Sequence, residues 1–185
     1  MNRFFLVLSC AVGLLIGSPA DAGSYAFTNS GSRISFTMSA TLHDIDGSAK
    51  SFKGSLDTDA GTGSLTIDAT SLTTDLGPRD DKMHSFCLES GTYGEMSLEV
   101  TSITGDLAGL QSGQGSGKVT LNGNLTIRDM VLEVAIPVDY GFEGEELSLR
   151  GSHRMSWKTF GVPDPSILIS KLAPSMKIKF KIKAK

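Results

Sequence analysis

Three polar residues of one short segment have side chains that can do chemistry. Arg79, Asp80 and His84 lie between Pro78 and Glu89, in a stretch that lacks the alternating pattern of its surroundings. A guanidinium can donate to carbonyl or phosphate oxygens, and a carboxylate and an imidazole can exchange protons with a bound molecule. Arg79 and Asp80 can instead anchor and cap a helix, because the helix dipole favours an acidic residue in the first turn. The sequence leaves both roles open.

Other reactive side chains are scattered. His43, His84 and His153 show no H-x-H or H-x-x-x-H spacing, so no metal site is expected. Cys87 has no C-x-x-C partner and suits a small buried hydrophobe. The glycine-rich residues 113–118 depart from the phosphate-loop pattern, and no G-x-S-x-G nucleophile motif occurs. We therefore assign no catalytic residue, metal or cofactor from these motifs.

Apolar and polar residues alternate through most of the chain. In the clearest row, Met176, Ile178, Phe180 and Ile182 are interleaved with four lysines. Alternation with a period of two predicts half-buried strands, and short turns between such strands predict an antiparallel sheet. Closing the sheet removes its edges. We therefore predict an all-β fold, an antiparallel barrel of about eight strands.

The apolar rows are the candidate lining of the barrel interior. The chosen residues are Phe36, Met38, Leu65, Ile67, Leu98, Val134, Ile136, Val138, Trp157, Ile178 and Phe180. For each of them, ordinary core packing is the alternative. An apolar face turned toward lipid would crowd the lysines of residues 177–183 inside the barrel, and a 7% aromatic content does not suit a membrane barrel. The lysine row is either simply solvated or meets anionic lipid at a membrane surface.

Two segments interrupt the alternation. Residues 78–89 predict a short helix at one end of the barrel, where Pro78 can start it. Met83, Phe86 and Cys87 share a face at three- and four-residue spacing, so Met83 and Phe86 can gate an opening. Residues 160–174 carry three prolines and predict a long loop. Turns are expected at residues 29–31, 59–61, 105–106, 109–117 and 143–145.

The first residues predict a secretory signal peptide. Arg3 precedes an apolar run that ends in Gly17-Ser18-Pro19 and the small-residue site Ala20-Asp21-Ala22. The expected division is a signal peptide over residues 1–22 and one barrel domain over residues 23–185, located in the periplasm or secreted. No membrane span is expected after cleavage. A net charge of −3 lacks the positive excess that is typical of proteins that bind nucleic acid.

Several short motifs, in their order, make the chain resemble the YceI family over most of residues 25–185. They are Ile34-Ser35-Phe36, Gly47 with Phe52-Lys53-Gly54-Ser55-Leu56, Ser71-Leu72-Thr73-Thr74, Arg79-Asp80-x-Lys82-Met83-His84, Tyr93-Gly94-Glu95-Met96, Gly123-Asn124-Leu125-Thr126-Ile127 and Phe160-Gly161-Val162. The chain departs from the family pattern at Gly94, where proline is usual, at Lys82, where many members have histidine, and at Leu88, where an aromatic residue is common.

The resemblance implies a lipocalin-like barrel that is exported and binds an isoprenoid lipid, of the quinone or polyprenol type. Arg79 would then meet a quinone carbonyl or a pyrophosphate. We therefore expect a carrier or store of a long-chain isoprenoid, not an enzyme. Two alternatives stay open: an enzyme that acts on such a lipid through Arg79, Asp80 and His84, and a barrel with a filled core that binds a protein partner through its loops.

Overall fold

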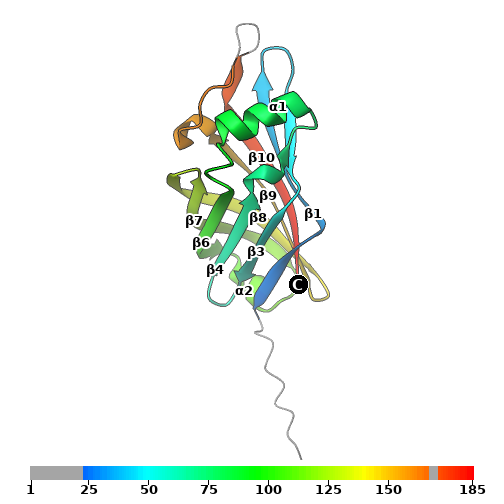
Figure 1. The fold of residues 1–185 in the computed structure, drawn as a ribbon. Coiled ribbons are helices and arrows are strands. Elements are labelled where there is room, and N and C mark those ends of the chain that lie inside the picture. The colour runs from blue at the N-terminus through cyan, green and yellow to red at the C-terminus, as the bar shows by residue number, and fades with distance from the viewer. Residues whose placement is uncertain (1–22, 167–170) are drawn as a thin grey trace, which may run out of the picture.

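The structure is a computed structural model that describes residues 23–166 and 171–185 (Figure 1). The expected signal peptide lies outside the described residues. The strands are β1 Ser24–Ala40, β2 Ile45–Ala49, β3 Phe52–Asp57, β4 Thr62–Asp68, β5 Leu72–Thr73, β6 Glu95–Gly105, β7 Ser116–Ile127, β8 Met130–Glu143, β9 Glu146–Ser156 and β10 Leu172–Ala184. The helical elements are η1 Ala69–Ser71, α1 Gly77–Lys82, the π-helical turn η2 Met83–Cys87, α2 Leu107–Gln111 and η3 Trp157–Phe160.

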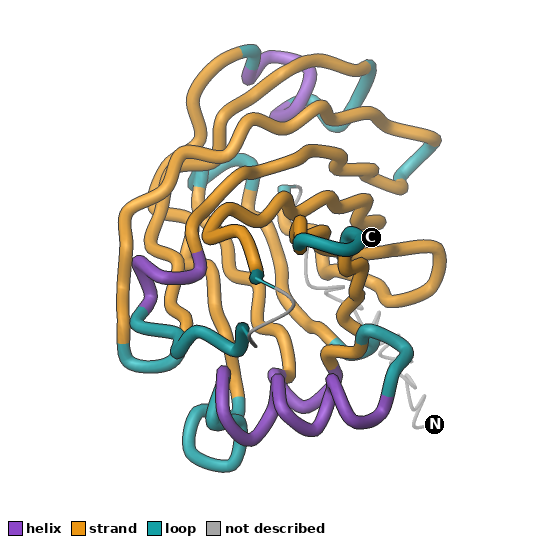
Figure 2. Tube along the Cα trace, turned by 90° about the horizontal axis from the view of Figure 1, so that it is seen from above, coloured by secondary structure: helices purple, strands orange, loops and turns teal. Residues whose placement is uncertain are grey.

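The strands form a closed antiparallel barrel. Their order is β10-β9-β8-β7-β6-β4-β3-β1-β2-β5, and β1 also pairs with β10, which closes the sheet. β2 and β3 are separated by two residues and both pair with β1, so they act as one interrupted strand. Eight strands therefore surround the interior, which confirms the predicted fold class; Figure 2 shows them encircling it.

The alternating rows take the faces that the sequence predicts. Ile178, Phe180 and Ile182 face the interior of the barrel and pack with the buried core. Lys179 and Lys181 point outward and are exposed. The predicted helix is confirmed at one end of the barrel, where α1 continues directly into η2 (Figure 1).

Three local predictions are wrong. Residues 29–31 are not a turn, because β1 runs through them as a bulge, with a register shift between Thr28 and Arg33 and a φ of 73° at Gly31. The expected loop at 109–117 contains the end of α2, a second short helix. The loop expected to reach Pro174 ends earlier, because β10 begins at Leu172 and includes that proline.

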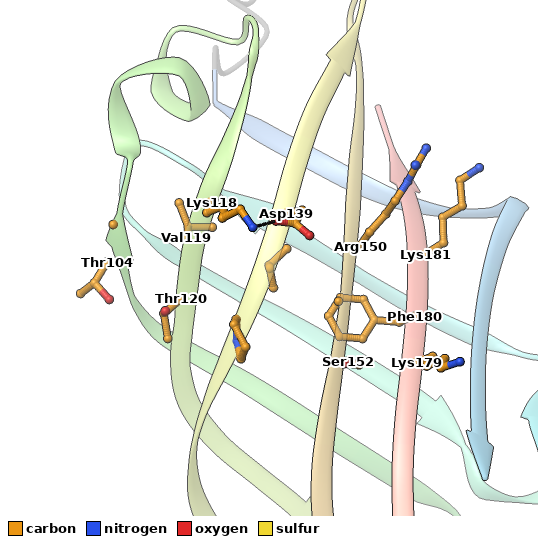
Figure 3. A pocket seen from close by; sticks show the side chains of 14 residues that line it. Thr104, Lys118, Val119, Thr120, Asp139, Arg150, Ser152, Lys179, Phe180 and Lys181 are labelled. Carbon is orange, nitrogen blue, oxygen red and sulfur yellow. Dashed lines mark ion pairs between the residues drawn. The ribbon is translucent and has the colours of Figure 1, made fainter.

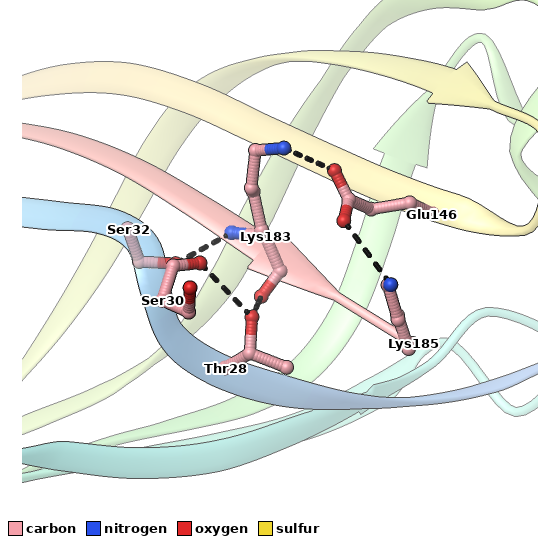
Figure 4. A network of polar contacts seen from close by, with 6 residues as sticks. All are labelled: Thr28, Ser30, Ser32, Glu146, Lys183 and Lys185. Carbon is pink, nitrogen blue, oxygen red and sulfur yellow. Dashed lines mark hydrogen bonds and ion pairs between the residues drawn. The ribbon is translucent and has the colours of Figure 1, made fainter.

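The β1 bulge is held to β10 by polar contacts (Figure 4). The backbone N–H of Lys183 donates to Ser32 Oγ at 2.8 Å, and Thr28 Oγ1 donates to the Lys183 carbonyl at 3.2 Å. The Lys183 ammonium pairs with Glu146, and Lys185 Nζ lies 3.7 Å from the other oxygen of that carboxylate. The hydrogen bond from Lys183 lowers the pKa of the Glu146 carboxyl. These contacts lie at the end of the barrel opposite α1 (Figure 1).

Candidate functional site

The barrel interior is hollow at the α1 end. The cavity has a volume of about 400 Å³. Its walls come mainly from β1 and β10, with two residues each from β2 and β7, and α1 and η2 cover one side. The apolar lining includes Ile34, Phe36, Met38, Ala49, Ile67, Leu72, Met83, Cys87, Leu88, Met96, Leu125, Ile127, Met155, Trp157, Val162, Leu172, Met176 and Ile178. Such a space can hold a flexible apolar chain.

Methionine is concentrated around this cavity. The chain contains seven methionines. Five of them line the hollow: Met38, Met83, Met96, Met155 and Met176. An unbranched thioether side chain adapts its shape to what it contacts. The lining is therefore suited to a molecule without a rigid outline.

The other half of the interior is filled. Leu56, Leu110, Leu147 and Leu149 are at most 2% exposed and pack in one continuous core. Core packing of this kind leaves little room for a ligand. The sequence left open whether the lumen is hollow or filled, and the structure divides it: hollow toward α1, filled toward the opposite end.

Half of the predicted site residues line the cavity. These are Phe36, Met38, Ile67, Arg79, Met83, Trp157 and Ile178. Among the others, Ile136 and Val138 are buried in the core, whereas Leu65, Leu98, Val134 and Phe180 pack partly buried against it. Alternation shows which way a side chain points but not how far along the barrel axis it lies. These residues therefore face the interior as predicted, but outside the part of it that is hollow.

Phe86 is placed differently from the prediction. Its side chain does not line the cavity and is 47% exposed. The reason is the π-helical turn, in which the Leu88 N–H donates to the Met83 carbonyl at 2.9 Å. This wider turn brings Met83 and Cys87 to the cavity and leaves Phe86 outside, where Lys82 lies over its ring.

Sequence reasoning missed several lining residues. Met96, Met155 and Met176 lie in the alternating rows and line the cavity, although they are not among the predicted lining residues. Cys87 also lines it, whereas the sequence predicts only a buried hydrophobe there. Burial raises the pKa of the Cys87 thiol. The recurrence of methionine in the alternating rows is the sequence signal that could have identified these lining residues.

Asp80 anchors the lid segment, defined as residues 77–88. Its carboxylate accepts hydrogen bonds from the Thr73 hydroxyl at 2.6 Å and the Thr74 N–H at 2.7 Å, and also from the Thr74 hydroxyl. Burial raises the pKa of this carboxyl, but the hydrogen bonds from Thr73 and Thr74 outweigh it and the net pKa is lowered. Asp80 therefore ties α1 to β5 and has a structural role.

Arg79 is not paired with Asp80. It lines the cavity and donates to Thr74, from Nε to the hydroxyl and from Nη2 to the carbonyl, both at 2.7 Å. Within the described part of the chain it forms no ion pair with a carboxylate. Lys82 also lines the cavity and donates to the Pro165 carbonyl at 2.7 Å. Two cations therefore border an apolar space.

The remaining polar candidates are engaged in structural contacts. His84 Nε2 lies 2.8 Å from the Leu72 carbonyl and is not among the lining residues. The Trp157 indole N–H donates to the Ala173 carbonyl at 2.8 Å, so only its ring faces the cavity. Arg79 Nε and the Asp80 carboxylate both bind the Thr74 hydroxyl, so all three polar candidates are engaged by hydrogen bonds to residues 72–74.

Strained backbone borders the cavity end. The non-glycine residues of the described chain with positive φ are Asp75, Glu89 and Arg128, at 58°, 48° and 58°. Arg128 Nη2 contacts Glu89 at 2.9 Å, and its Nη1 donates to the Gly161 carbonyl at 2.8 Å. This clamp joins the residue that follows the lid segment, the β7–β8 hairpin and the loop after η3. Such strain persists where surrounding contacts hold it.

A second hollow of about 550 Å³ lies on the outside of β7–β10 (Figure 3). Exposed polar and charged side chains such as Arg150 and Lys181 border it, and Lys118 pairs with Asp139 at 3.3 Å. It is larger than the interior cavity, and charged side chains from several strands border it. In residues 23–166 and 171–185, no group of acidic, histidine and cysteine side chains can hold a metal, and no helix has the length and apolar character needed to cross a membrane.

Comparisons with known proteins agree with this architecture. The model of the YceI-like domain matches residues 25–184. No curated protein sequence matches the chain. BcnA of Burkholderia cenocepacia is 18% identical with a TM-score of 0.72, over 86% of this chain and 99% of that one. A polyisoprenoid binding domain from Saccharophagus degradans, implicated in plant cell wall breakdown, is 15% identical with a TM-score of 0.75, over 87% and 97%. A YCEI protein of Campylobacter jejuni is 14% identical with a TM-score of 0.62, over 77% and 85%.

Proposed function

The chain belongs to the YceI-like family, and from that premise we propose that it is a carrier or store of an isoprenoid lipid and acts by binding, not by catalysis. The observation that carries the proposal is the methionine-lined cavity at the α1 end of the barrel. The solved relative that is described as a polyisoprenoid binding domain supports the choice of lipid.

The tail of the lipid would occupy the apolar part of the cavity. A cavity of about 150 Å³ holds one benzene ring, so about 400 Å³ holds roughly 16 carbons on the same scale. Each buried methylene contributes about 0.8 kcal/mol. A long tail would therefore bind through its first 16 or so carbons, and the rest would lie beyond the cavity.

The polar end of the lipid would lie beside Arg79 and Lys82. Both line the cavity, and neither forms an ion pair within the described chain. A guanidinium donates readily to phosphate or to a carbonyl oxygen. A pyrophosphate or quinone head fits this chemistry.

We propose that the protein acts outside the cytoplasm, in the periplasm or secreted. This part of the proposal rests on the pattern of residues 1–22, in which a positive residue, an apolar run and a small-residue site follow one another. Sequencing the N-terminus of the exported protein tests it, with Gly23 as the expected first residue.

Mass spectrometry of an organic extract of the purified native protein tests the binding function. We expect one class of isoprenoid in stoichiometric amount. The matched control is Ala49→Phe, which adds a ring to the lining and should abolish co-purification. A second readout is Cys87, which lines the cavity and is the single cysteine of the expected mature chain. Bound lipid should slow its reaction with a thiol reagent. A barrel that is extracted empty and stays empty when incubated with farnesol contradicts the proposal.

A further inference from the structure

The outer surface of β1, β9 and β10 carries a concentration of positive charge. We call this surface the basic face. It consists of six cations that point outward from neighbouring strands: Arg33, Arg150, Arg154, Lys177, Lys179 and Lys181. All are exposed except Lys177, which is half-buried. The chain as a whole has a net charge of −3, so positive charge is segregated onto one side of the barrel.

The strand register places like charges directly opposite one another. Lys181 pairs with Arg33 on β1 and with Arg150 on β9. Lys177 pairs with Arg154 on β9. Like charges in directly opposed positions destabilise a sheet. The fold therefore tolerates repeated pairs of like charges in opposed positions on the basic face.

The charges of the basic face are not neutralised within the described chain. Its six cations form no ion pair there. The acid that continues the row of Arg33, Lys181 and Arg150 is Asp139 on β8, and its carboxylate is engaged by Lys118 (Figure 3). Lys183, the remaining lysine of β10, is bound to Glu146 and does not belong to this face.

We infer that the basic face docks the barrel on an anionic lipid bilayer. The inference rests on the proposed function, because a lipid carrier must exchange its cargo with a membrane. The cations are spread over three strands and do not converge on one buried point, which fits a surface of many negative head groups better than a single anion. Juxtaposed lysines and arginines are attracted to such a surface additively, and the attraction is screened by salt.

Vesicle co-sedimentation tests the inference with the mature protein. We expect binding to phosphatidylcholine vesicles that contain about a third phosphatidylglycerol, no binding to pure phosphatidylcholine, and loss of binding at high salt. The variant Lys177→Gln/Lys179→Gln/Lys181→Gln should weaken binding by roughly tenfold to a hundredfold. The control Lys50→Gln/Lys53→Gln/Lys185→Gln has the same net charge but changes no residue of the basic face, and it should bind like wild type.

Three outcomes overturn the inference: equal binding to both kinds of vesicle, equal weakening in the two triple variants, or retention by a soluble polyanion such as heparin without binding to vesicles. The test is separate from that of the proposed function. A protein that loads lipid but ignores anionic vesicles contradicts only the docking surface. A protein that binds vesicles through the basic face but never loads lipid contradicts only the carrier role.

Discussion

The ring of Phe36 lies where a side chain on Gly47 would have to be. The two residues are cross-strand partners on β1 and β2, and a Cβ built on Gly47 would lie 2.2 Å from Cζ of Phe36. The absent side chain lets the ring lie flat against β2 at the edge of the cavity. The volume available to a ligand therefore depends on a glycine that does not itself line the cavity.

The variant Gly47→Ala should push the Phe36 ring into the cavity. We expect the free energy of unfolding to fall by about 1–3 kcal/mol, as in other overpacked cores, and lipid binding to weaken. Chemical denaturation and Trp157 fluorescence, which reports from the cavity wall, measure the two effects. Gly91→Ala is the control, because nothing lies within 4 Å of a Cβ there. Equal effects of the two variants would contradict this account.

Removing the Phe36 ring should lengthen the tail that the cavity accepts. The variant Phe36→Ala vacates space for about six carbons on the benzene scale and should destabilise the empty protein by about 3–5 kcal/mol. Native mass spectrometry with C10, C15, C20 and C40 prenols should show affinity that rises with tail length up to C15 in wild type and up to C20 in the variant, and that stays level for longer tails. Phe142→Ala, which truncates a ring packed against Tyr25 away from the cavity, should keep the wild-type dependence on tail length.

Arg79→Gln should separate head-group recognition from tail binding. We expect the affinity for a prenyl phosphate to fall by about 1.5–3 kcal/mol, the range for hydrogen bonds to charged groups, with little change for the alcohol of the same tail. Isothermal titration of both ligands measures the difference. Lys53→Gln removes an exposed cation outside the cavity and serves as the control. If both ligands lose affinity equally, Arg79 positions the lid segment and not the head group.

Stability should fall in mildly acidic solution because of His153. Burial lowers the pKa of its imidazole below the ordinary value of 6.5, so the unfolded chain takes up a proton more readily than the folded one. The free energy of unfolding should then be level above pH 6.5, decrease as the pH falls through that value, and level off below the folded pKa. Denaturation between pH 8 and pH 5 measures this slope.

The variant His153→Gln is the matched comparison for the pH effect. It should abolish the slope, because the variant lacks the half-buried imidazole whose pKa is lowered on folding. Asp80 and Asp164 also have lowered pKa values, the latter about 2, through hydrogen bonds and, for Asp164, through Lys158. They contribute stability that is present above their unfolded pKa values and is lost as the pH falls through their lowered folded values. A slope that persists in the variant would assign the effect to another group.

The amino-acid sequence by itself determined which way most side chains point. Alternation in residues 176–183 places Ile178 inside and Lys179 outside, because successive strand residues face opposite sides whatever the neighbouring strand is. The short helix after Pro78 and the barrel itself follow from equally local patterns. These are the predictions that the structure confirms.

Only the tertiary structure decided depth and juxtaposition. Strand register arises from pairings between residues far apart in the chain, and it places Ile136 and Val138 in the filled half but Met155 and Met176 around the cavity. It also brings Arg33, Lys181 and Arg150 into one row. The π-helical turn that leaves Phe86 outside depends on the packing of the lid segment on the barrel. No local spacing encodes these relationships, because each depends on how separate segments meet.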